Sequence, residues 1–480
     1  MNSIWQTTTD FPRGRSLPGD QTTDVAIIGG GMAGILTAWF LKKKGIKATV
    51  LEADSIGSGQ TGHTTAKITA QHGAIYHTLI KTFGEKKALE YAQSNSDAIT
   101  AYAKLIQEEQ IDCHFEFQPS YLYSMTDIQE LKQEVTACND LGLPAQFTTE
   151  SALPFSISGA AVLPKQAQFH PLDFLSALVK QIDVFENTPV VEVVENQVRT
   201  DHGTVTAQNI VFATHYPFPN LPGLYFMRMH QERSYVIALE GAAKLDGMYF
   251  GMDPDGLSFR NFGDYLLLGG GKHRTGENPK GGRYEMLRQT ARQFWPNCRE
   301  VASWSAQDCM TLDGVPYIGQ FSSSTPNWYV ATGFEKWGMT HSMVAAQRIC
   351  QLIAGEKTVG DSIFSPSRFT PSASAKSFLK DGLHAVQDLS RQILAPPREK
   401  FSSIPNGHGG IVEYHGKKAG VYKDLNGELF VVSTRCPHLG CQLEWNPDEK
   451  SWDCPCHGSR FDYRGNRLDN PAQENLLSER

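Results

Sequence analysis

The chain has 480 residues and a formal net charge of −7; 40% of its residues are hydrophobic and 20% are charged. This length predicts two or three domains, and the negative balance excludes a basic face for nucleic acid. No run reaches the roughly 18 apolar residues that cross a bilayer, and the N-terminus lacks a basic region followed by an apolar one. We therefore expect a cytoplasmic protein without a membrane span.

The first elements in chain order are a strand, a glycine-rich turn, a helix and a second strand. Residues 24–29 (DVAIIG) form a short apolar run that is typical of a buried parallel strand. Residues 32–45 have helical spacing and close on three lysines and a glycine, and residues 47–53 (KATVLEA) form the second strand. This order predicts a βαβ unit.

The turn of this unit carries the glycine pattern of a dinucleotide-binding site. GGGMAG places Gly29, Gly31 and Gly34 in GxGxxG register, which permits a tight turn, a close approach to a pyrophosphate and close helix packing. Glu52 ends the second strand, where a carboxylate can accept hydrogen bonds from both ribose hydroxyls. We predict a dinucleotide site here rather than a structural glycine turn.

The composition and the hydrophobic pattern of the remaining chain change twice. The middle mixes helices, for example at 85–108, with alternating segments such as DYLLLGGGK (264–272), which indicates an α+β substrate domain. Residues 370–404 have small polar and Pro-, Gly- and Ser-rich stretches around a short helical pattern, which predicts a linker with one helix. Residues 405–480 contain short strands broken by turns, as in a small all-β module.

Residues 22–368 resemble the FAD-dependent amine oxidoreductases of the D-amino-acid oxidase type, which include glycine, sarcosine and gamma-glutamylputrescine oxidases. Besides the glycine motif, the resemblance rests on the segments 57–73 (GSGQTGHTTAKITAQHG), 211–219 (VFATHYPFP), 304–319 and 329–356. It implies that residues 1–369 form an α/β Rossmann-like FAD-binding domain with an inserted α+β substrate domain. The FAD-binding segments are expected at about 22–75, 155–220 and 300–358, and a second glycine motif for NAD(P)H is missing.

The same resemblance implies which residues surround the FAD. The expected set is Gly29, Gly31, Gly34, Glu52, His63, Thr64, Thr65, Val191 (or its neighbour Val190) against the adenine, Gly333, Gly338, Met339 and Thr340. His63 fits either covalent attachment of FAD, as in some family members, or hydrogen bonding alone.

Candidate substrate-binding residues are fewer. Lys67 is the candidate catalytic cation beside the flavin, where it would stabilise negative charge on the reduced flavin or bind a substrate carboxylate; a solvated loop lysine is the alternative. Arg233, Tyr235, Arg260 and His273 are candidates for the pocket lining. Family members often carry an arginine before the DG element, whereas this chain has Asp308 there, which puts recognition of a plain amino-acid carboxylate in question.

Soft metal ligands are concentrated near the C-terminus. In CPHLGC (436–441) and CPCHGS (454–459), Cys436 with His438 and Cys454 with His457 each offer one thiolate and one imidazole. A [2Fe–2S] cluster with Cys₂ and His₂ ligation needs this set. Zinc accepts the same donors, but the C-x-H spacing of the first pair and the extra cysteine in each loop favour the cluster.

The two loops resemble the Rieske motif over about residues 405–475. The resemblance implies that Cys436 and Cys454 bind one iron and that His438 and His457 bind the other. Cys441 and Cys456 correspond to the disulfide of the cytochrome-complex type of Rieske protein, and Ser459 corresponds to a hydroxyl that donates to a bridging sulfide.

Both modules together predict a flavin-dependent oxidoreductase that acts on the CH–NH or CH–NH₂ group of an amine or amino acid. Electrons would pass from FAD to the Rieske cluster and on to an external one-electron acceptor. Two alternatives stay open: a reductase that an external donor feeds through the cluster, and a redox sensor or electron-transfer module without amine turnover.

Overall fold

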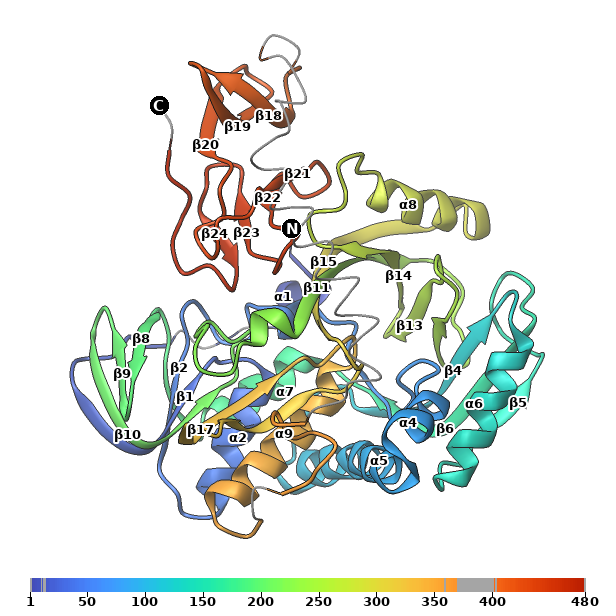
Figure 1. Ribbon diagram of the computed structural model, residues 1–480. Coiled ribbons are helices and arrows are strands. Elements are labelled where there is room, and N and C mark those ends of the chain that lie inside the picture. Colours follow the sequence, from blue (N-terminus) through green and yellow to red (C-terminus); the bar gives the residue numbers. More distant parts are fainter. Residues whose placement is uncertain are drawn as a thin grey trace.

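The computed structural model describes residues 2–9, 11, 14–357, 360–368, 401 and 404–478. Two large sheets and a small all-β module make up this part of the chain (Figure 1). The predicted linker with a helix, residues 370–404, lies outside the described residues except for its last positions.

The first large sheet contains the predicted βαβ unit. Its main order is β16-β17-β10-β1-β2-β7, with β8 and β9 joined to β10. Strand β1 pairs in parallel with both β10 and β2, which is the pairing a right-handed helical crossover produces. The strands are β1 (Gln21–Ile28), β2 (Ala48–Leu51), β7 (Asp183–Phe185), β8 (Val190–Val194), β9 (Gln197–Thr200), β10 (Gly203–Phe212), β16 (Tyr317–Ser322) and β17 (Thr325–Thr332).

The second large sheet belongs to the inserted domain. Its order is β15-β11-β14-β13-β12-β4-β6-β3, with β5 beside β6. The strands are β3 (Lys67–Ile68), β4 (Glu116–Ser124), β5 (Gln146–Thr148), β6 (Gly159–Gln168), β11 (Met229–Glu240), β12 (Met248–Gly251), β13 (Ser258–Phe262), β14 (Tyr265–Arg274) and β15 (Arg299–Thr311).

Two of the expected FAD-binding segments contain strands of the second sheet. The segment expected at about 155–220 includes β6, which pairs with β4, and the segment expected at about 300–358 includes β15, which pairs with β11. The FAD-binding sheet therefore takes up the chain at β7 and again at β16. The sequence patterns of β6 and β15 are compatible with either sheet, because an apolar pattern predicts a buried strand without showing which strand lies beside it.

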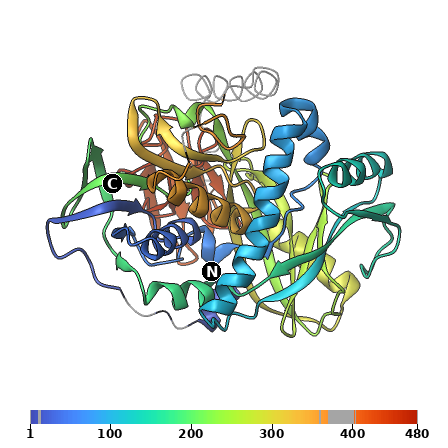
Figure 2. The same ribbon diagram turned by 90° about the horizontal axis from the view of Figure 1, so that it is seen from below.

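Helices cover the first sheet and separate the two halves. They are α1 (Ile4–Thr8), α2 (Met32–Lys43), α3 (Gln60–His63), α4 (Tyr76–Phe83), α5 (Glu85–Glu108), α6 (Ile128–Asp140), α7 (Pro171–Val179), η1 (Tyr225–Met227), α8 (Arg283–Phe294) and α9 (Gly338–Ile353). Helix α9 packs against α2 and α5, and α5 runs between the nucleotide-binding half and the substrate half (Figure 2). Among the described residues, no helix is long and apolar enough to span a bilayer.

The C-terminal module consists of two small antiparallel sheets. Strands β18 (His408–Tyr414), β19 (Lys417–Lys423) and β20 (Leu429–Ser433) form one sheet, and β21 (Glu444–Asn446), β22 (Ser451–Asp453), β23 (Arg460–Asp462) and β24 (Arg467–Asp469) form the other. Trp452 and Phe461 are fully buried in its core. Figure 1 shows this module against β11 and β15 of the substrate sheet, which brings the two cysteine loops to the catalytic part.

Candidate functional site

A cavity of about 570 Å³ opens at the carboxyl ends of β1 and β2. It is lined by Gly29 and Gly31 of the glycine motif and by Glu52, and it extends to residues of the substrate sheet. Segment 467–470 of the C-terminal module also lines it. The carboxyl edge of a parallel sheet at a glycine turn is where dinucleotides bind in such folds.

The glycine motif is shaped for a pyrophosphate. Gly34 lies in α2 with its Cα hydrogens against the carbonyl oxygen of Gly29, so that any larger side chain would collide with the backbone there. The N-terminus of α2 has no side-chain cap, which leaves backbone N–H groups of its first turn available to an anion. These features fit the dinucleotide FAD.

Glu52 offers the expected carboxylate for the ribose. It lines the cavity and accepts hydrogen bonds from the N–H groups of Gly30 (2.6 Å) and Asp54 (2.9 Å). Burial raises the pKa of Glu52. With one oxygen on each backbone N–H, the remaining lone pairs face the cavity and can accept from hydroxyl groups.

Glu52→Gln is expected to weaken FAD binding about tenfold, because the amide NH₂ group that replaces one oxygen cannot accept a hydrogen bond. Titration of the apoprotein with FAD, followed by flavin fluorescence, measures the change in Kd. Glu150→Gln, an exposed carboxylate on the surface, is the control. An unchanged Kd in Glu52→Gln would show that this carboxylate does not hold the ribose.

The cavity gathers most, though not all, of the residues that were expected around FAD. His63, Thr64, Thr65, Gly338 and Met339 line it. Gly333 and Thr340 do not: Thr340 Oγ1 donates to the carbonyl oxygen of Thr69 at 2.8 Å. These two residues shape the turn behind the cavity wall.

The two valines expected near the adenine lie differently. Val190 lines the cavity, whereas 58% of Val191 is exposed to solvent. Successive side chains of a strand point to opposite faces, so a shift of one residue in β8 exchanges the inner and outer positions.

One ring nitrogen of His63 is already hydrogen-bonded to the backbone. Its Nδ1 contacts the carbonyl oxygen of Gly59 at 2.8 Å, and burial lowers its pKa. The carbonyl oxygen of His63 accepts a hydrogen bond from Trp304 Nε1 at 2.9 Å, which fixes the loop. The geometry holds the ring at the cavity wall.

Lys67 is buried in the cavity without a carboxylate. Its Nζ donates to Ser258 Oγ and to the carbonyl oxygen of Tyr249 (3.4 Å). Burial, and secondly the nearby Arg260 guanidinium, lower the pKa of Lys67 to about 7. The alternative of a solvated loop lysine is therefore wrong, because only 8% of this side chain is exposed.

The two cysteine loops bring the four predicted cluster ligands together. The rings of His438 and His457 lie 4.9 Å apart between centroids. Their Nδ1 atoms are buried and have no hydrogen-bond partner within the described chain. A buried ring nitrogen without a partner is costly unless it binds a metal, so both imidazoles fit an iron.

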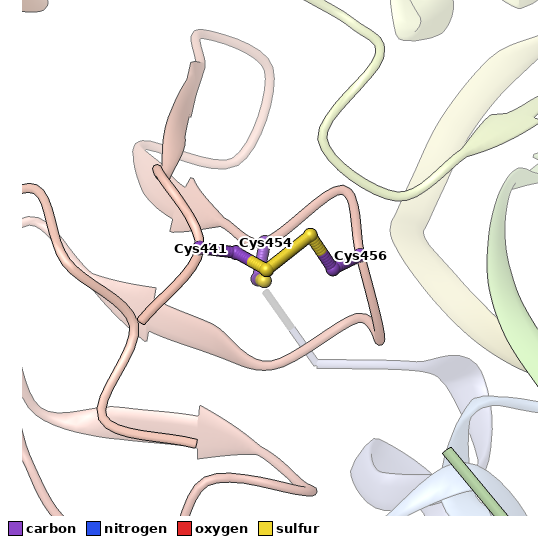
Figure 3. Close-up of side chains that lie close together, drawn as sticks. All are labelled: Cys441, Cys454 and Cys456. Carbon is purple, nitrogen blue, oxygen red and sulfur yellow. A yellow bond between two sulfur atoms is a disulfide. The ribbon is translucent and has the colours of Figure 1, made fainter. Parts of the chain in front are cut away.

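The sulfur atoms divide into a thiol pair and a disulfide. Cys436 and Cys454 are hydrogen-bonded through their side chains, which lowers the pKa of Cys436 to about 7. Cys441 and Cys456 form a disulfide between the loops. Figure 3 shows Cys454 beside this disulfide, with the sulfurs of Cys441, Cys454 and Cys456 within 4.8 Å of one another. Because two of these three sulfurs are oxidised, the fitting ligand set is Cys436, His438, Cys454 and His457.

Ser459 lies next to this ligand set. It is fully buried, its hydroxyl reaches the Cys436 thiol, and its Oγ accepts a hydrogen bond from the N–H of Ala472 at 3.0 Å. The hydroxyl hydrogen is thus free to point toward the sulfur side of the loops, as expected for a donor to the cluster.

Two buried glutamines separate the cavity from the second cluster loop. Gln307 lines the cavity and its Nε2 donates to the carbonyl oxygen of Gly458 (2.9 Å) and to Gln231 Oε1 (2.6 Å). Gln231 Nε2 donates to the carbonyl oxygen of His457 at 2.8 Å. Both side chains are 1% exposed. Gln307 is therefore the one side chain between the cavity and the backbone of Gly458, the residue that follows the cluster histidine His457.

The segment before β11 covers the histidine end of the loops. His438 Nε2 lies 2.7 Å from Asn220 Oδ1, and because that oxygen only accepts, the proton is on Nε2 and the Nδ1 lone pair is left for a metal. The Phe226 ring lies against both imidazoles, with centroids 6.4 Å from His438 and 5.8 Å from His457. The cluster loops thus face the catalytic part.

The expected substrate residues are used differently from the prediction. Arg233 does not line the cavity: it forms an ion pair with Glu449 of the C-terminal module. Arg260 donates to the backbone carbonyls of Thr65 and Ala66 behind the cavity. Tyr235 does line the cavity. Sequence reasoning could not separate these roles, since the partner of Arg233 is 216 positions away.

His273, the fourth of these residues, lines a second cavity of about 480 Å³. Five residues border both cavities, which therefore adjoin: Phe250, Lys272, Glu335, Lys336 and Trp337. Sequence reasoning missed four residues of the site, because polar and aromatic residues outside a motif cannot be told from ordinary core or loop positions: Gln231, Gln307, Asn220 and Phe226.

Comparison with known proteins agrees with this geometry. A family model described as FAD dependent oxidoreductase (DAO) matches residues 24–352, and one of the Rieske [2Fe-2S] domain matches residues 398–478. YhfW of Bacillus subtilis (strain 168), a candidate Rieske 2Fe-2S iron–sulfur protein, is 37% identical over 487 residues, which cover 98% of this chain and 96% of YhfW.

Two further relatives cover the catalytic part. Gamma-glutamylputrescine oxidoreductase of Escherichia coli (strain K12) is 23% identical and covers 70% of this chain and 84% of its own. The crystal structure of glycine oxidase from Geobacillus kaustophilus superposes with a TM-score of 0.61 at 20% identity and covers 72% of this chain and 99% of its own. The chain therefore belongs to the FAD-dependent oxidoreductases of the D-amino-acid oxidase type, with FAD as its flavin cofactor, and it carries a C-terminal Rieske [2Fe–2S] domain.

Proposed function

We propose that this protein is a dehydrogenase that oxidises the C–N bond of an amine or amino acid and delivers the electrons, one at a time, through its Rieske domain to an external acceptor. Bound FAD would supply the acceptor for a hydride and the cluster a carrier of single electrons. The observation that carries the proposal is the contact of Gln307, a cavity residue, with Gly458 of the second cluster loop.

The glutamine pair supports electron passage within the chain. Gln231 and Gln307 hold the backbone of His457 and Gly458 against the cavity wall, and His215 Nε2, from the same wall, lies 3.0 Å from Gln231 Oε1. A short path of buried hydrogen-bonded groups excludes water and fixes the separation of the two redox sites.

The walls of the adjoining cavities support a cationic or amine substrate. Tyr235, Phe250 and Trp337 supply aromatic surface, which attracts a substituted ammonium group. Lys336 is not free to repel it, because its charge is compensated by Asp308 (2.8 Å) and Glu232 (3.1 Å). The compounds in the names of two relatives, gamma-glutamylputrescine and glycine, belong to the same class of amines and amino acids.

Lys67 is placed to take a proton from the substrate ammonium group. An amine loses hydride readily only as the free base, and Lys67, whose pKa burial lowers to about 7, is largely neutral above that pH. Its lone pair can then accept the ammonium proton at Nζ. Ser258 and Tyr249, the hydrogen-bond acceptors of Nζ, orient it.

The second-order rate constant of flavin bleaching by the substrate reports on groups of the free enzyme. It is accordingly expected to rise with pH through about 7. Lys67→Met should lower the bleaching rate about 100-fold and remove this inflection, because the base is lost. Stopped-flow absorbance at several pH values measures both, and Lys180→Met, an exposed lysine at the end of α7, is the control. A variant that keeps the inflection would assign the titration to another group.

The experiment that tests the proposed function is an anaerobic substrate screen. Holoenzyme is mixed with amines, amino acids and glutamylated polyamines, and bleaching of the flavin band is recorded. At least one member of these classes should bleach the flavin within seconds. If none does so while dithionite bleaches it, the protein is not an amine dehydrogenase.

A further inference from the structure

Four large apolar side chains are exposed beside the first cluster loop. Three come from the segment before β11 and one follows the ligand His438; we call them the apolar patch, which consists of Leu221, Leu224, Met227 and Leu439. Their exposed fractions are 73%, 41%, 46% and 43%, respectively. Large exposed apolar side chains that come together from different segments mark interaction surfaces.

The apolar patch is continuous across the domain boundary. Leu221 follows Asn220 and Leu439 follows His438, and the hydrogen bond between Asn220 and His438 spans only 2.7 Å. Phe226, between Leu224 and Met227 in the turn of η1, lies against the His438 ring. The patch therefore surrounds the covered edge of a cluster ligand.

The two segments that carry the apolar patch have a net positive formal charge. Segments 213–228 and 434–443 contain no aspartate or glutamate. Arg435 is exposed, and Arg228 stacks on Tyr317 and donates to the carbonyl oxygen of Pro366. Neither arginine forms an ion pair with a carboxylate of the described residues. A matching partner has an apolar centre and an acidic rim.

The two cluster histidines face different neighbours. The loop of His457 is held by Gln231 and Gln307 at the FAD cavity, whereas His438 is next to the apolar patch. Electrons can thus enter on one side and leave on the other. A second copy of this chain fits the patch poorly, because a two-fold contact would bring the two cationic rims together.

We propose that the apolar patch is the docking surface of a small one-electron carrier protein with an acidic rim, which exchanges an electron with the cluster through His438. This inference rests on the proposed function only for the direction of flow. In each encounter one electron moves between the carrier's redox centre and the cluster, so that one is oxidised as the other is reduced and no bond or proton changes place. A small and transient interface suits repeated encounters.

The test uses holoenzyme and a reduced plant-type [2Fe–2S] ferredoxin, an acidic carrier whose potential lies below that of Rieske centres. Stopped-flow absorbance gives the second-order rate constant of cluster reduction at several salt concentrations. The rate constant should fall steeply with salt. Arg435→Glu, and separately the double variant Leu221→Ser/Met227→Ser, should each lower it about tenfold at low salt.

Matched controls lie away from the apolar patch. Leu425→Ser removes an apolar side chain that is 74% exposed in the same module, and Lys86→Glu makes the same charge change on α5. Both should keep the wild-type rate constant. Equal rate constants in patch variants and controls would overturn the proposal. The proposal would also be overturned if the patch variants changed only the sedimentation coefficient, because the patch would then be a dimer contact. A change only in binding to anionic vesicles would overturn it as well.

Failure of the proposed function has a different signature. Substrate-driven bleaching of the flavin requires no carrier, and it should be unchanged in every patch variant. If no amine bleaches the wild-type flavin while ferredoxin still reduces the cluster in a patch-dependent manner, the docking surface stands and the dehydrogenase does not.

Discussion

Arg233→Met is expected to destabilise the docked Rieske domain by about 3 kcal/mol, because the buried carboxylate of Glu449 then keeps only one of its two arginine partners. Arg233 is 2% exposed and forms an ion pair with Glu449, whose side chain is 11% exposed. Although burial alone would raise it, Arg233 and Arg460 hold the pKa of Glu449 well below its usual range. Arg460 also pairs with Glu449 (2.8 Å), but it shares its charge with Asp453 (3.1 Å) and Asp469 (2.9 Å).

Calorimetry of the holoenzyme measures this effect as a lower unfolding temperature of the Rieske domain. The double variant Arg233→Met/Glu449→Met should recover much of the loss, since replacing both members of a buried pair by apolar groups is close to neutral. Arg288→Met removes an arginine from a partly exposed pair with Glu300 and should cost less than about 1 kcal/mol. A loss in Arg233→Met as small as that control would contradict the role given to the pair.

The same pair sets a pH dependence. A carboxyl group whose pKa is depressed on folding contributes stability that is complete above its unfolded value, near 4.5 for Glu449, and is lost as the pH falls toward the folded value. The Rieske transition should therefore move to lower temperature below that pH, and less so in the double variant.

Gly458→Ala is expected to slow electron passage into the cluster while leaving substrate oxidation intact. Gly458 has φ = +84°, and a Cβ there would lie 2.6 Å from Gln231 Cβ and 2.7 Å from its Nε2. The added methyl group must displace Gln231, which holds the backbone of His457. The contact between the cavity wall and the cluster loop then opens.

Stopped-flow absorbance at the flavin and cluster bands separates the two steps. Gly416→Ala is a matched control, because Gly416 has φ = +76° in the same domain with nothing within 4 Å of the added Cβ. Both substitutions carry the backbone strain of about 1–2 kcal/mol that a left-handed conformation costs an alanine, but only Gly458→Ala should slow cluster reduction. Equal slowing in both variants would assign the effect to strain.

Local patterns were sufficient for one group of predictions. The glycine motif, the strand that ends at Glu52, the helix at 85–108 and the cluster ligands are all read from spacings of a few residues. Each of these features depends on backbone geometry or on the number of metal ligands. Residues close together in the sequence are enough to determine both.

Contacts between distant segments could not be predicted in this way. Arg233 was expected at the substrate and instead binds Glu449, and Asn220 meets His438 across 218 positions. Nothing in the local sequence around either residue distinguishes a domain contact from a pocket. Val191 shows the remaining limit, since a strand pattern identifies two faces without saying which one the cavity occupies.

One measurement tests the central claim that the two redox centres work as a relay. Holoenzyme is mixed anaerobically with an amine or amino acid that bleaches its flavin, and samples frozen over time are examined by EPR for the reduced Rieske cluster. We predict that the cluster signal grows as the flavin is bleached, without any added mediator. A bleached flavin beside a cluster that stays oxidised until dithionite is added would contradict the relay.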